Sequence, residues 1–454
     1  IKEQEKLMKL SLPQNRWNGD APVEINIPDD WDTGVSIMEG DSYPALSYEE
    51  LKAKIDAPIG CEPLYEMAKG KKSACIVFDD NTRPTPIKEM AHIVLDELLE
   101  AGVPKDKIIF LCALGCHGTC ELDDFVKKLG EDICREYPVY NHNCFFNLDD
   151  VGTTSHGIRV MINHEFMTAD IKIGLGAITP HAFNGFGGGC KIVLPGIAGF
   201  DTNVTNHKVE LSRVMLNRDR PFYECHGNLQ YKGVREDEEE AAMLAGLDFK
   251  VDGIMNSSCQ LIDAFCGHPI KEYYEGIKRA QFIYNTPHLD KADVVIVNAN
   301  AKANEATFAV NIGADHVLPG GDVVMVNFNK VGLVNHYLGC QWGFEAKGPL
   351  SPANKIGQPL ANGMRQLIMF NPYPEYKHAI TYGDPSQVKW ASTWEEVMGY
   401  LGDRGAGTKC SVFKEVILSM FADDYKKEYT PVNLELTKEN VREVIKERIA
   451  AQEQ

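Results

Sequence analysis

Residues 179–207, TPHAFNGFGGGCKIVLPGIAGFDTNVTNH, constrain the fold of this chain more than any other segment. Two histidines and a lysine share the segment with a dense run of glycines, among them Gly185, Gly187, Gly188 and Gly189. Glycine loses more conformational freedom on folding than any other residue and adds no side chain to a core. So many glycines therefore indicate a backbone that turns sharply or approaches another group closely.

A bound phosphate would explain the glycines, because free backbone N–H groups at the start of a short helix can bind an anion. Lys191 would then lie at the mouth of the loop. The segment is not a P-loop, since Cys190 precedes the lysine and Ile192 follows it, and it does not match the dinucleotide fingerprint G-x-G-x-x-G. A tight turn beneath a helix explains the glycines equally well, and both interpretations stay open.

The length and the charge of the chain limit the classes of protein it can belong to. With 454 residues it is too long for a single core, so two or three domains are expected. The net charge of -19 and the lack of a basic cluster argue against nucleic-acid binding. No apolar run is long enough to cross a membrane, and the acidic run 236–240 is interpreted as a solvated helix face.

The cysteines indicate a reducing compartment. There are thirteen, without a spacing repeat and without a signal peptide before them, which is typical of free thiols in the cytoplasm. Cys112, Cys116 and Cys120 form a C-x3-C-x3-C set, but this spacing matches no usual zinc or cluster motif. Because Cys112 lies in an apolar, strand-like run, the three are interpreted as buried thiols.

Strand, loop and helix patterns alternate in the first half of the chain, as in an α/β sheet. Buried strands are expected at 73–78, 107–113 and 170–174, with helices at 87–101 and from 122. In such sheets, ligands gather at the carboxyl ends of the strands. Three successive strand ends carry Asp80 with Arg83, then His117, then His181 with Lys191. The sequence therefore predicts that these five residues share one crevice.

The second half repeats the alternation. Expected elements are helices at 202–216, from 236, at 303–312, 392–401 and 437–450, a hairpin at 249–265, and strands at 293–298, 323–327 and 380–382. We predict two α/β domains with an active-site cleft between them. Residues 1–280 would form the cofactor-binding and catalytic domain, and 285–430 a Rossmann-like domain. The final helix, within 436–454, is expected to pack on the first domain.

Four blocks resemble the signature blocks of the lactate racemase family: DDNTRPTP at 79–86, ALGCH at 113–117, PHAFNGFGGGCKIVLPG at 180–196 and TNH at 205–207. They come in the family's order, and the similarity covers most of the chain. The resemblance implies an isomerase that inverts C2 of a 2-hydroxy acid. It also implies a nickel-pincer nucleotide, pyridinium-3-thioamide-5-thiocarboxylic acid mononucleotide, supplied by separate cofactor-synthesis proteins.

The family's residue roles transfer to matching positions of this sequence. By this resemblance Lys191 carries the cofactor through a thioamide, and His207 is the protein's nickel ligand. His117 and His181 are the acid/base pair, and Arg83 binds the substrate carboxylate. The resemblance also implies five further cofactor-binding residues: Asp80, Thr82, Gly187, Gly188 and Gly189. The chemistry suits a 2-hydroxy acid, whose α-hydrogen is poorly acidic beside an ionised carboxylate. Hydride transfer to and from the cofactor avoids removing that hydrogen as a proton.

The sequence departs from the family pattern near the substrate. Gly118 stands where an arginine often follows the first catalytic histidine, which favours a substrate larger or more polar than lactate. An aldonate fits this first, and a dicarboxylic or longer 2-hydroxy acid second. The segment with Lys302, Asn304 and Glu305 matches the family only loosely, so the roles of these residues stay open.

Three other functions are alternatives for this sequence. Inversion of lactate itself remains an alternative, and so does a protein that binds the cofactor without turnover. Retention of both His117 and His181 argues against such a carrier, which needs no acid/base pair. A nicotinamide dehydrogenase is disfavoured because the dinucleotide fingerprint is missing after the strands at 73–78 and 293–298.

Overall fold

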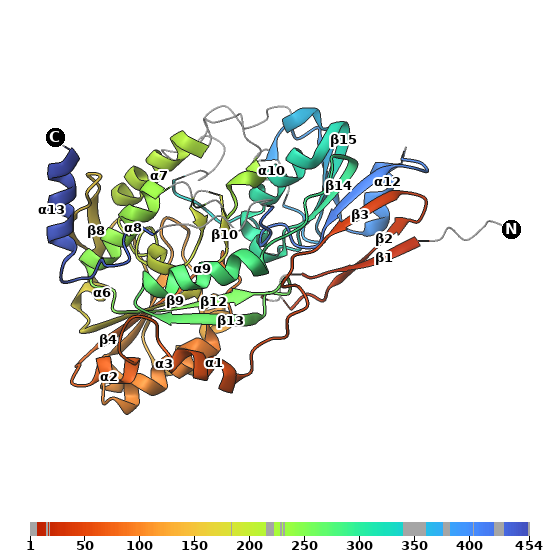
Figure 1. Ribbon diagram of the computed structural model, residues 1–454. Helices are drawn as coiled ribbons and strands as arrows, with labels where there is room; N and C mark the ends of the chain where they lie inside the picture. Colours follow the sequence, from red (N-terminus) through yellow and green to blue (C-terminus); the bar gives the residue numbers. More distant parts are fainter. Residues whose placement is uncertain are drawn as a thin grey trace.

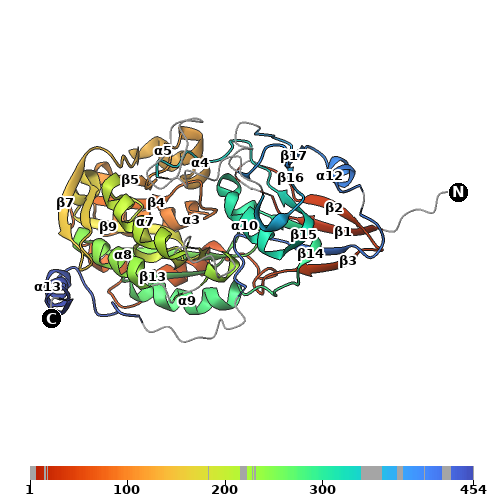
Figure 2. The ribbon, with the colours of Figure 1, turned by 90° about the horizontal axis from the view of Figure 1, so that it is seen from above.

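The structure is a computed structural model that describes residues 7–14, 17, 19–182, 184–214, 222–227, 229, 232–338, 360–375, 382–402, 404–421 and 431–452. It is a mixed α/β fold, as the sequence predicts. Two six-stranded sheets, built mostly from parallel strands, form its framework, and helices pack on them (Figure 1). Figure 2 shows the two sheets toward opposite ends of the molecule.

The first sheet contains the three expected strands of the first half at its centre. Its order is β13 (Leu261–Gly267), β12 (Phe249–Met255), β9 (Ile171–Ala177), β4 (Ala74–Asp79), β5 (Ile108–Ala113) and β6 (Val139–Asn141). All neighbours are parallel except the hairpin of β12 and β13. Every residue of β4 is buried, which fits a parallel strand covered on both faces. The register pairs Asp79 with Ala113, so the loops after β4 and β5 leave the sheet side by side.

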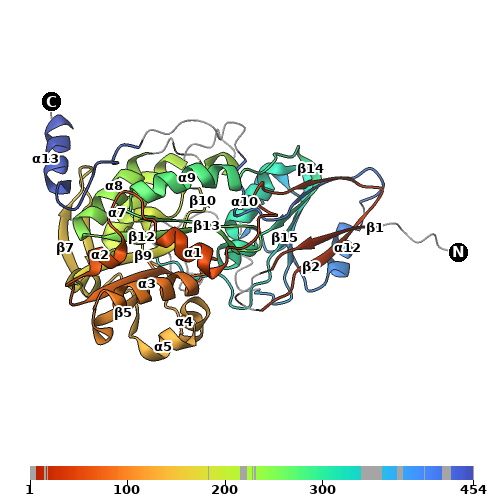
Figure 3. The same ribbon diagram turned by 60° about the horizontal axis from the view of Figure 1, so that its bottom comes forward.

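Helices cover both faces of this sheet. Figure 1 and Figure 3 show α1 (Tyr48–Ile55), α2 (Leu64–Ala68) and α3 (Lys88–Glu100) on one face, and α7 (Phe200–Val214), α8 (Lys232–Ala245) and α9 (Lys271–Ile283) on the other. The short helices α4 (Leu122–Leu129), α5 (Glu131–Glu136) and α6 (His164–Thr168) and the hairpin of β7 (Leu148–Thr153) and β8 (Arg159–Asn163) complete this half. A capping box between Ser47 and Glu50 fixes the start of α1.

The second sheet is parallel throughout. Its order is β17 (Val388–Ala391), β16 (Gln366–Phe370), β15 (Val317–Val326), β14 (Ala292–Asn298), β18 (Lys409–Phe413) and β3 (Asp32–Ser36). α10 (Thr307–His316) packs on β14 and β15, and α12 (Trp394–Leu401) packs on β16 and β17. The hairpin of β1 (Leu7–Leu12) and β2 (Val23–Pro28) shares a core with this sheet.

Part of the N-terminal region belongs to the second sheet. Residues 1–280 were expected to form one unit, yet β3 hydrogen-bonds to β18 and thereby extends the second sheet, with Ser36 opposite Phe413. At the other end, α13 (Val441–Gln452) contacts α8, where Arg448 Nη1 lies 2.6 Å from Glu240 Oε1. The division into two domains remains a prediction, and the strand expected at 380–382 falls largely outside the described residues.

The solvated face predicted for the acidic run 236–240 is wrong. The run lies in α8, and Asp237, Glu238, Glu239 and Glu240 are buried. α8 is enclosed by α7, α13, β7 and the short helix η3 (Gly189–Ile192), so its charged face points into protein. Buried carboxylates need partners, and these have them: Arg235 pairs with Glu238, Tyr274 and Asn433 donate to Glu239, and Ser155 and Arg448 donate to Glu240.

The cysteines match their expected state. Every described cysteine is a free thiol, and Cys112 is buried in β5. Within the described residues, no group of three or more histidine, cysteine, aspartate or glutamate side chains is arranged to hold a metal ion. In that same part of the chain, none of the helices combines the length and the apolar character that crossing a membrane requires.

Candidate active site

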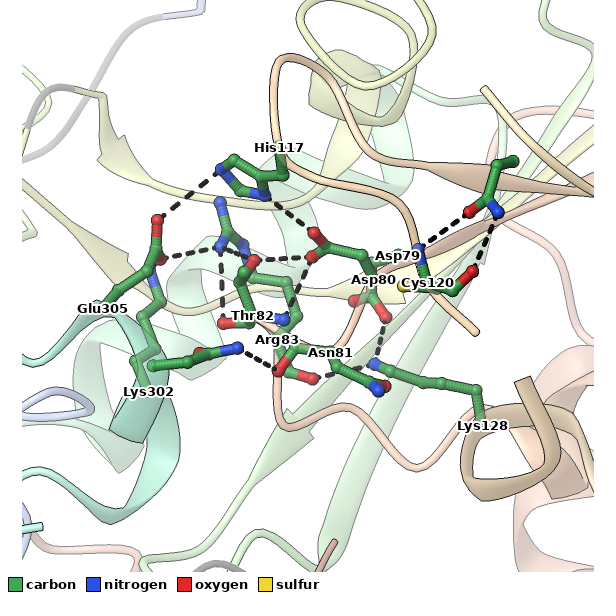
Figure 4. Close-up of polar contacts among 12 residues, drawn as sticks. Asp79, Asp80, Asn81, Thr82, Arg83, His117, Cys120, Lys128, Lys302 and Glu305 are labelled. Atoms are coloured by element: carbon green, nitrogen blue, oxygen red, sulfur yellow. Dashed lines mark hydrogen bonds and ion pairs between the residues drawn. The ribbon is translucent and has the colours of Figure 1, made fainter. Parts of the chain in front are cut away.

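The loop after β4 is held by a buried ion pair. Lys128, whose side chain is 1% exposed, places Nζ 2.7 Å from Asp79 Oδ1 and donates to the backbone oxygen of Arg83 at 2.8 Å. Thr85 Oγ1 donates to Asp79 Oδ2 at 2.6 Å. Charged hydrogen bonds of this kind are strong where water is excluded. Asp79 and Lys128 therefore fix the backbone from which the next side chains project (Figure 4).

Asp80 connects this loop to the loop after β5. Its Oδ2 lies 2.7 Å from His117 Nδ1, and its Oδ1 accepts from the backbone and the hydroxyl of Thr82. Burial alone would raise the pKa of Asp80, but the neighbouring His117 and Arg83 outweigh it and hold that pKa well below its ordinary value. An ionised Asp80 binds the Nδ1–H tautomer of His117, which leaves Nε2 as the free ring nitrogen. The predicted meeting of Asp80, Arg83 and His117 is thus present (Figure 4).

Side chains from the second sheet enter the same site. Lys302 and Glu305 belong to η5 (Asn300–Glu305), which follows β14, and the sequence left their roles open. Glu305 Oε2 lies 3.0 Å from Arg83 Nη1 and 3.6 Å from Lys302 Nζ, while Oε1 lies 3.7 Å from His117 Nε2. The site is therefore built by loops that follow strands of both sheets (Figure 4).

Burial and the mutual charges shift the pKa values of this group. Burial raises the pKa of Glu305, but Arg83 and Lys302 outweigh that effect and lower it to about 2. Burial lowers the pKa of Lys302 to about 8, and the adjacent Arg83 cation contributes in the same direction. Near neutral pH, Glu305 is therefore an anion between two cations.

A further loop of the second half closes against His117. Gly118 N donates to Asn335 O at 2.8 Å, and Tyr337 N donates to Cys116 O at 2.8 Å. Between these contacts, the ring of His336 meets that of His117 edge to face, with centroids 4.8 Å apart. No pattern in the sequence points to His336, because the contact joins loops that are far apart in the chain.

Asn335 is the neighbour of Gly118 on this loop. A Cβ atom at Gly118 would lie 3.4 Å from Asn335 Cβ, so the loop that contains Asn335 and His336 packs directly on the glycine. Gly118 thus takes part in a backbone pairing, and a substrate larger or more polar than lactate remains a prediction.

The glycine segment is shaped by packing. Gly187 N donates to Thr179 O at 2.7 Å, and Gly189 N donates to the carboxylate of Asp252. A Cβ atom at Gly189, where φ is +57°, would lie 2.8 Å from Tyr273 Cγ. The expectation that these N–H groups are free for a phosphate is therefore wrong for Gly187 and Gly189, because the chain itself uses them. The tight-turn interpretation is the correct one there.

The same segment places Lys191 against His181. β10 (Pro180–His181) pairs with β11 (Gly185–Phe186), and η3 then brings Lys191 Nζ to 2.8 Å from His181 Nε2. Burial lowers the pKa of Lys191 well below its ordinary value, and Arg83 and Lys302 add to the shift. Burial followed by Lys191 lowers the pKa of His181 in the same direction. Burial therefore favours the neutral form of both nitrogens, the form that a nucleophile and a base require.

His207 lies on α7 in the same electrostatic neighbourhood. Its Nδ1 donates to Asn203 O at 2.9 Å, which leaves Nε2 as the nitrogen with a free lone pair. Burial lowers the pKa of His207 to about 4, and Lys191 and His117 contribute to that shift. His207 is not among the residues expected at strand ends; its electrostatic interactions with Lys191 and His117 place it near them.

The fold and the site define a class: an α/β protein with two mostly parallel sheets, whose buried polar site combines histidines and carboxylates with the cations Arg83 and Lys302. Comparison with known proteins narrows this class. The lactate racemase N-terminal domain profile matches residues 18–216. Over this domain the chain is similar to the lactate racemase family.

Two curated relatives are both described as lactate racemase. The protein from Thermoanaerobacterium thermosaccharolyticum is 30% identical over 284 residues, 62% of this chain and 65% of the relative. The protein from Lactiplantibacillus plantarum is 30% identical over 297 residues, 64% of this chain and 66% of the relative. The matched region thus spans just under two thirds of each relative.

Two solved structures share the fold. The lactate racemase apoprotein from Thermoanaerobacterium thermosaccharolyticum superposes with a TM-score of 0.69 at 23% identity, covering 92% of this chain and 100% of that one. A protein from Thermotoga maritima superposes with a TM-score of 0.58 at 17% identity, covering 85% and 99%. At these identities the likeness supports the fold alone.

Proposed function

We propose that this chain is a racemase or epimerase that inverts C2 of a 2-hydroxy acid. The observation that carries the proposal is the pair His117 and His181, which reach one site from different strand ends with Arg83 and Lys302 beside them. Inversion needs a proton acceptor and donor for each face of the reacting carbon. The similarity of the chain to proteins described as lactate racemase supports the same activity.

The residues present fit the nickel-pincer nucleotide of the family. Lys191 has a buried amine of lowered pKa, suited to covalent attachment, and His207 has an unprotonated Nε2 suited to a metal. No cluster of protein ligands is needed, because the pincer brings its own sulfur and carbon donors; none occurs among the described residues. When bound, the cofactor supplies the hydride acceptor that the side chains lack.

The remaining steps belong to the protein. Arg83 and Lys302 attract the substrate carboxylate, and this orients C2 and its hydroxyl toward the histidines. His117 Nε2 accepts the hydroxyl proton from one enantiomer, while Asp80 keeps the ring in the required tautomer. His181 Nε2 does the same for the other enantiomer. In one inversion His117 gains the hydroxyl proton, and His181 in its protonated form gives a proton to the product oxygen. Proton exchange with solvent then restores both histidines, and the opposite inversion uses them in reversed roles.

Intact-mass analysis tests the proposal. Protein made in cells that synthesise the cofactor should exceed its sequence mass and should interconvert the enantiomers of a 2-hydroxy acid on a chiral column. Lys191→Ala should lose both the excess mass and the activity, whereas Lys208→Ala, an exposed lysine of the same helix as His207, should keep both. Turnover by an unmodified chain would contradict the proposal. An adduct without any inversion would identify a carrier instead.

A further inference from the structure

We propose that Glu305 selects the substrate of this site: it admits a 2-hydroxy acid that carries one carboxylate and a hydroxyl-bearing chain, and it discriminates against a second carboxylate. The inference rests on the proposed function and narrows its substrate class to polyhydroxylated monocarboxylic acids, of which gluconate is an example. The observation behind it is a fixed anion within a site that must also hold an anionic substrate.

Glu305 is held firmly where the substrate has to bind. Its side chain is 11% exposed, and one oxygen, Oε2, is shared by Arg83 and Lys302. The other oxygen, Oε1, lies 3.7 Å from His117 Nε2, which is too far for a hydrogen bond but close to the nitrogen that handles the proton. A carboxylate has about four acceptor positions, so Glu305 can still accept hydrogen bonds from a substrate.

Charge balance decides how many carboxylates fit. Arg83 and Lys302 supply two positive charges, and Glu305 offsets one of them. The ionised Asp80 also attracts Arg83 and offsets part of the second positive charge. The two cations are thus already largely offset, which suits a substrate with no more than a single carboxylate. A second carboxylate would lie beside Glu305 without a cation of its own, and an unpaired charge of like sign is unfavourable at a buried site.

Substrate hydroxyl groups, unlike a second carboxylate, interact favourably with Glu305. A substrate hydroxyl that donates to Glu305 forms a charge-assisted hydrogen bond, which is stronger than one between neutral groups. Neither lactate nor a purely aliphatic 2-hydroxy acid has a hydroxyl beyond C2 to offer. The carboxylate of Glu305 therefore weakens the binding of dicarboxylates and strengthens the binding of substrates with hydroxylated chains.

Binding measurements on the purified protein test this without requiring turnover. Dissociation constants for gluconate, 2-hydroxyglutarate and lactate are measured by calorimetry on the wild type and on Glu305→Gln, which keeps the size of the side chain and removes its charge. We expect the variant to bind 2-hydroxyglutarate roughly tenfold to a hundredfold more tightly relative to gluconate. Glu395→Gln, at an exposed glutamate of α12, is the matched control and should leave all three constants unchanged.

Two results would overturn the inference. If Glu305→Gln tightens the three acids by the same factor, Glu305 merely competes with substrate for Arg83. If it changes none of them, Glu305 does not face the substrate. Should the variant melt at a much lower temperature than the wild type, Glu305→Asp replaces it: the charge stays, so 2-hydroxyglutarate should still be rejected, while gluconate should bind more weakly because the shorter side chain no longer reaches its hydroxyls.

Inversion assays on the same three acids separate this inference from the proposed function. Inversion of these acids with an unchanged preference in Glu305→Gln would refute the selectivity and leave the racemase proposal standing. A shifted binding preference in a loaded protein that inverts no acid would support the selectivity and refute the racemase proposal.

Discussion

Replacing Asp80 by asparagine should slow inversion by roughly three orders of magnitude. The side chain is 5% exposed, and its Oδ2 lies 2.7 Å from His117 Nδ1. When His117 takes the hydroxyl proton, its ring becomes a cation next to this carboxylate. Two unit charges about 4 Å apart at an effective dielectric constant of about 20 attract each other by about 4 kcal/mol, and each 1.36 kcal/mol is about tenfold in rate.

The assay follows kcat by chiral chromatography and checks cofactor occupancy by intact mass in the same preparation. The chain provides a matched control on its surface, where Asp149 Oδ2 lies 2.8 Å from His164 Nδ1 and both side chains are more than 40% exposed. Asp149→Asn removes a pair of the same kind from water, where such pairs contribute little, so its kcat should match the wild type.

The reasoning fails if Asp80→Asn loses less than tenfold in kcat at full occupancy. It would also fail if occupancy and kcat fall in parallel, because Asp80 would then serve cofactor binding, the role that the family resemblance implies. Asparagine keeps an oxygen that can accept from Thr82, so the loop itself should survive the change. Equal melting temperatures for the variant and the wild type verify this point.

Three further predictions concern pH, stability and the histidines. The pKa of Lys302 is about 8, so its charge is present below that pH and is lost above it. KM for a carboxylate substrate should therefore rise above about pH 8. In Lys302→Arg the cation persists, so the rise in KM should move beyond about pH 10. Arg235→Met leaves Glu238 as an unpaired buried charge. This variant should lower the free energy of unfolding by about 3 to 5 kcal/mol, which a denaturant titration measures. Adding Glu238→Gln to it should restore part of the lost stability. His117→Ala and His181→Ala should each reduce kcat by at least about a hundredfold while the mass of the adduct stays; parallel loss of both would assign them to the fold.

The strand-end rule explains how much of the site the sequence could predict. Asp80, Arg83 and His117 follow buried, apolar strands whose pattern is plain in the sequence, and parallel pairing of β4 with β5 then brings their loops together. The same rule could have found Glu305, because the polar segment 299–305 directly follows another buried strand. His336 follows no strand end, and only the tertiary contact with the loop at Gly118 reveals it.

The interpretations of the acidic run 236–240 and of the glycine run fail for the same reason. Local composition does not determine which distant parts of the chain a segment packs against. Five consecutive acidic residues at 236–240 are usually solvated, but α8 faces partners such as Arg448 and Tyr274 from distant parts of the chain. A glycine run likewise has the same composition whether it binds an anion or packs on a ring. Gly189 packs on Tyr273, a residue of α9 that no local pattern connects to it.

The pairing of β3 with β18 sets an order of events during synthesis. The ribosome delivers a chain from its N-terminus, so β3 is released long before its only strand partner in the described structure, β18, has been translated. Through that interval the segment at Asp32–Ser36 carries unpaired backbone groups, as any open strand edge does. The second sheet can receive its outermost strand only after almost the whole protein has emerged, so a ribosome stalled before β18 would hold a nascent chain whose first sheet can be complete while the second cannot.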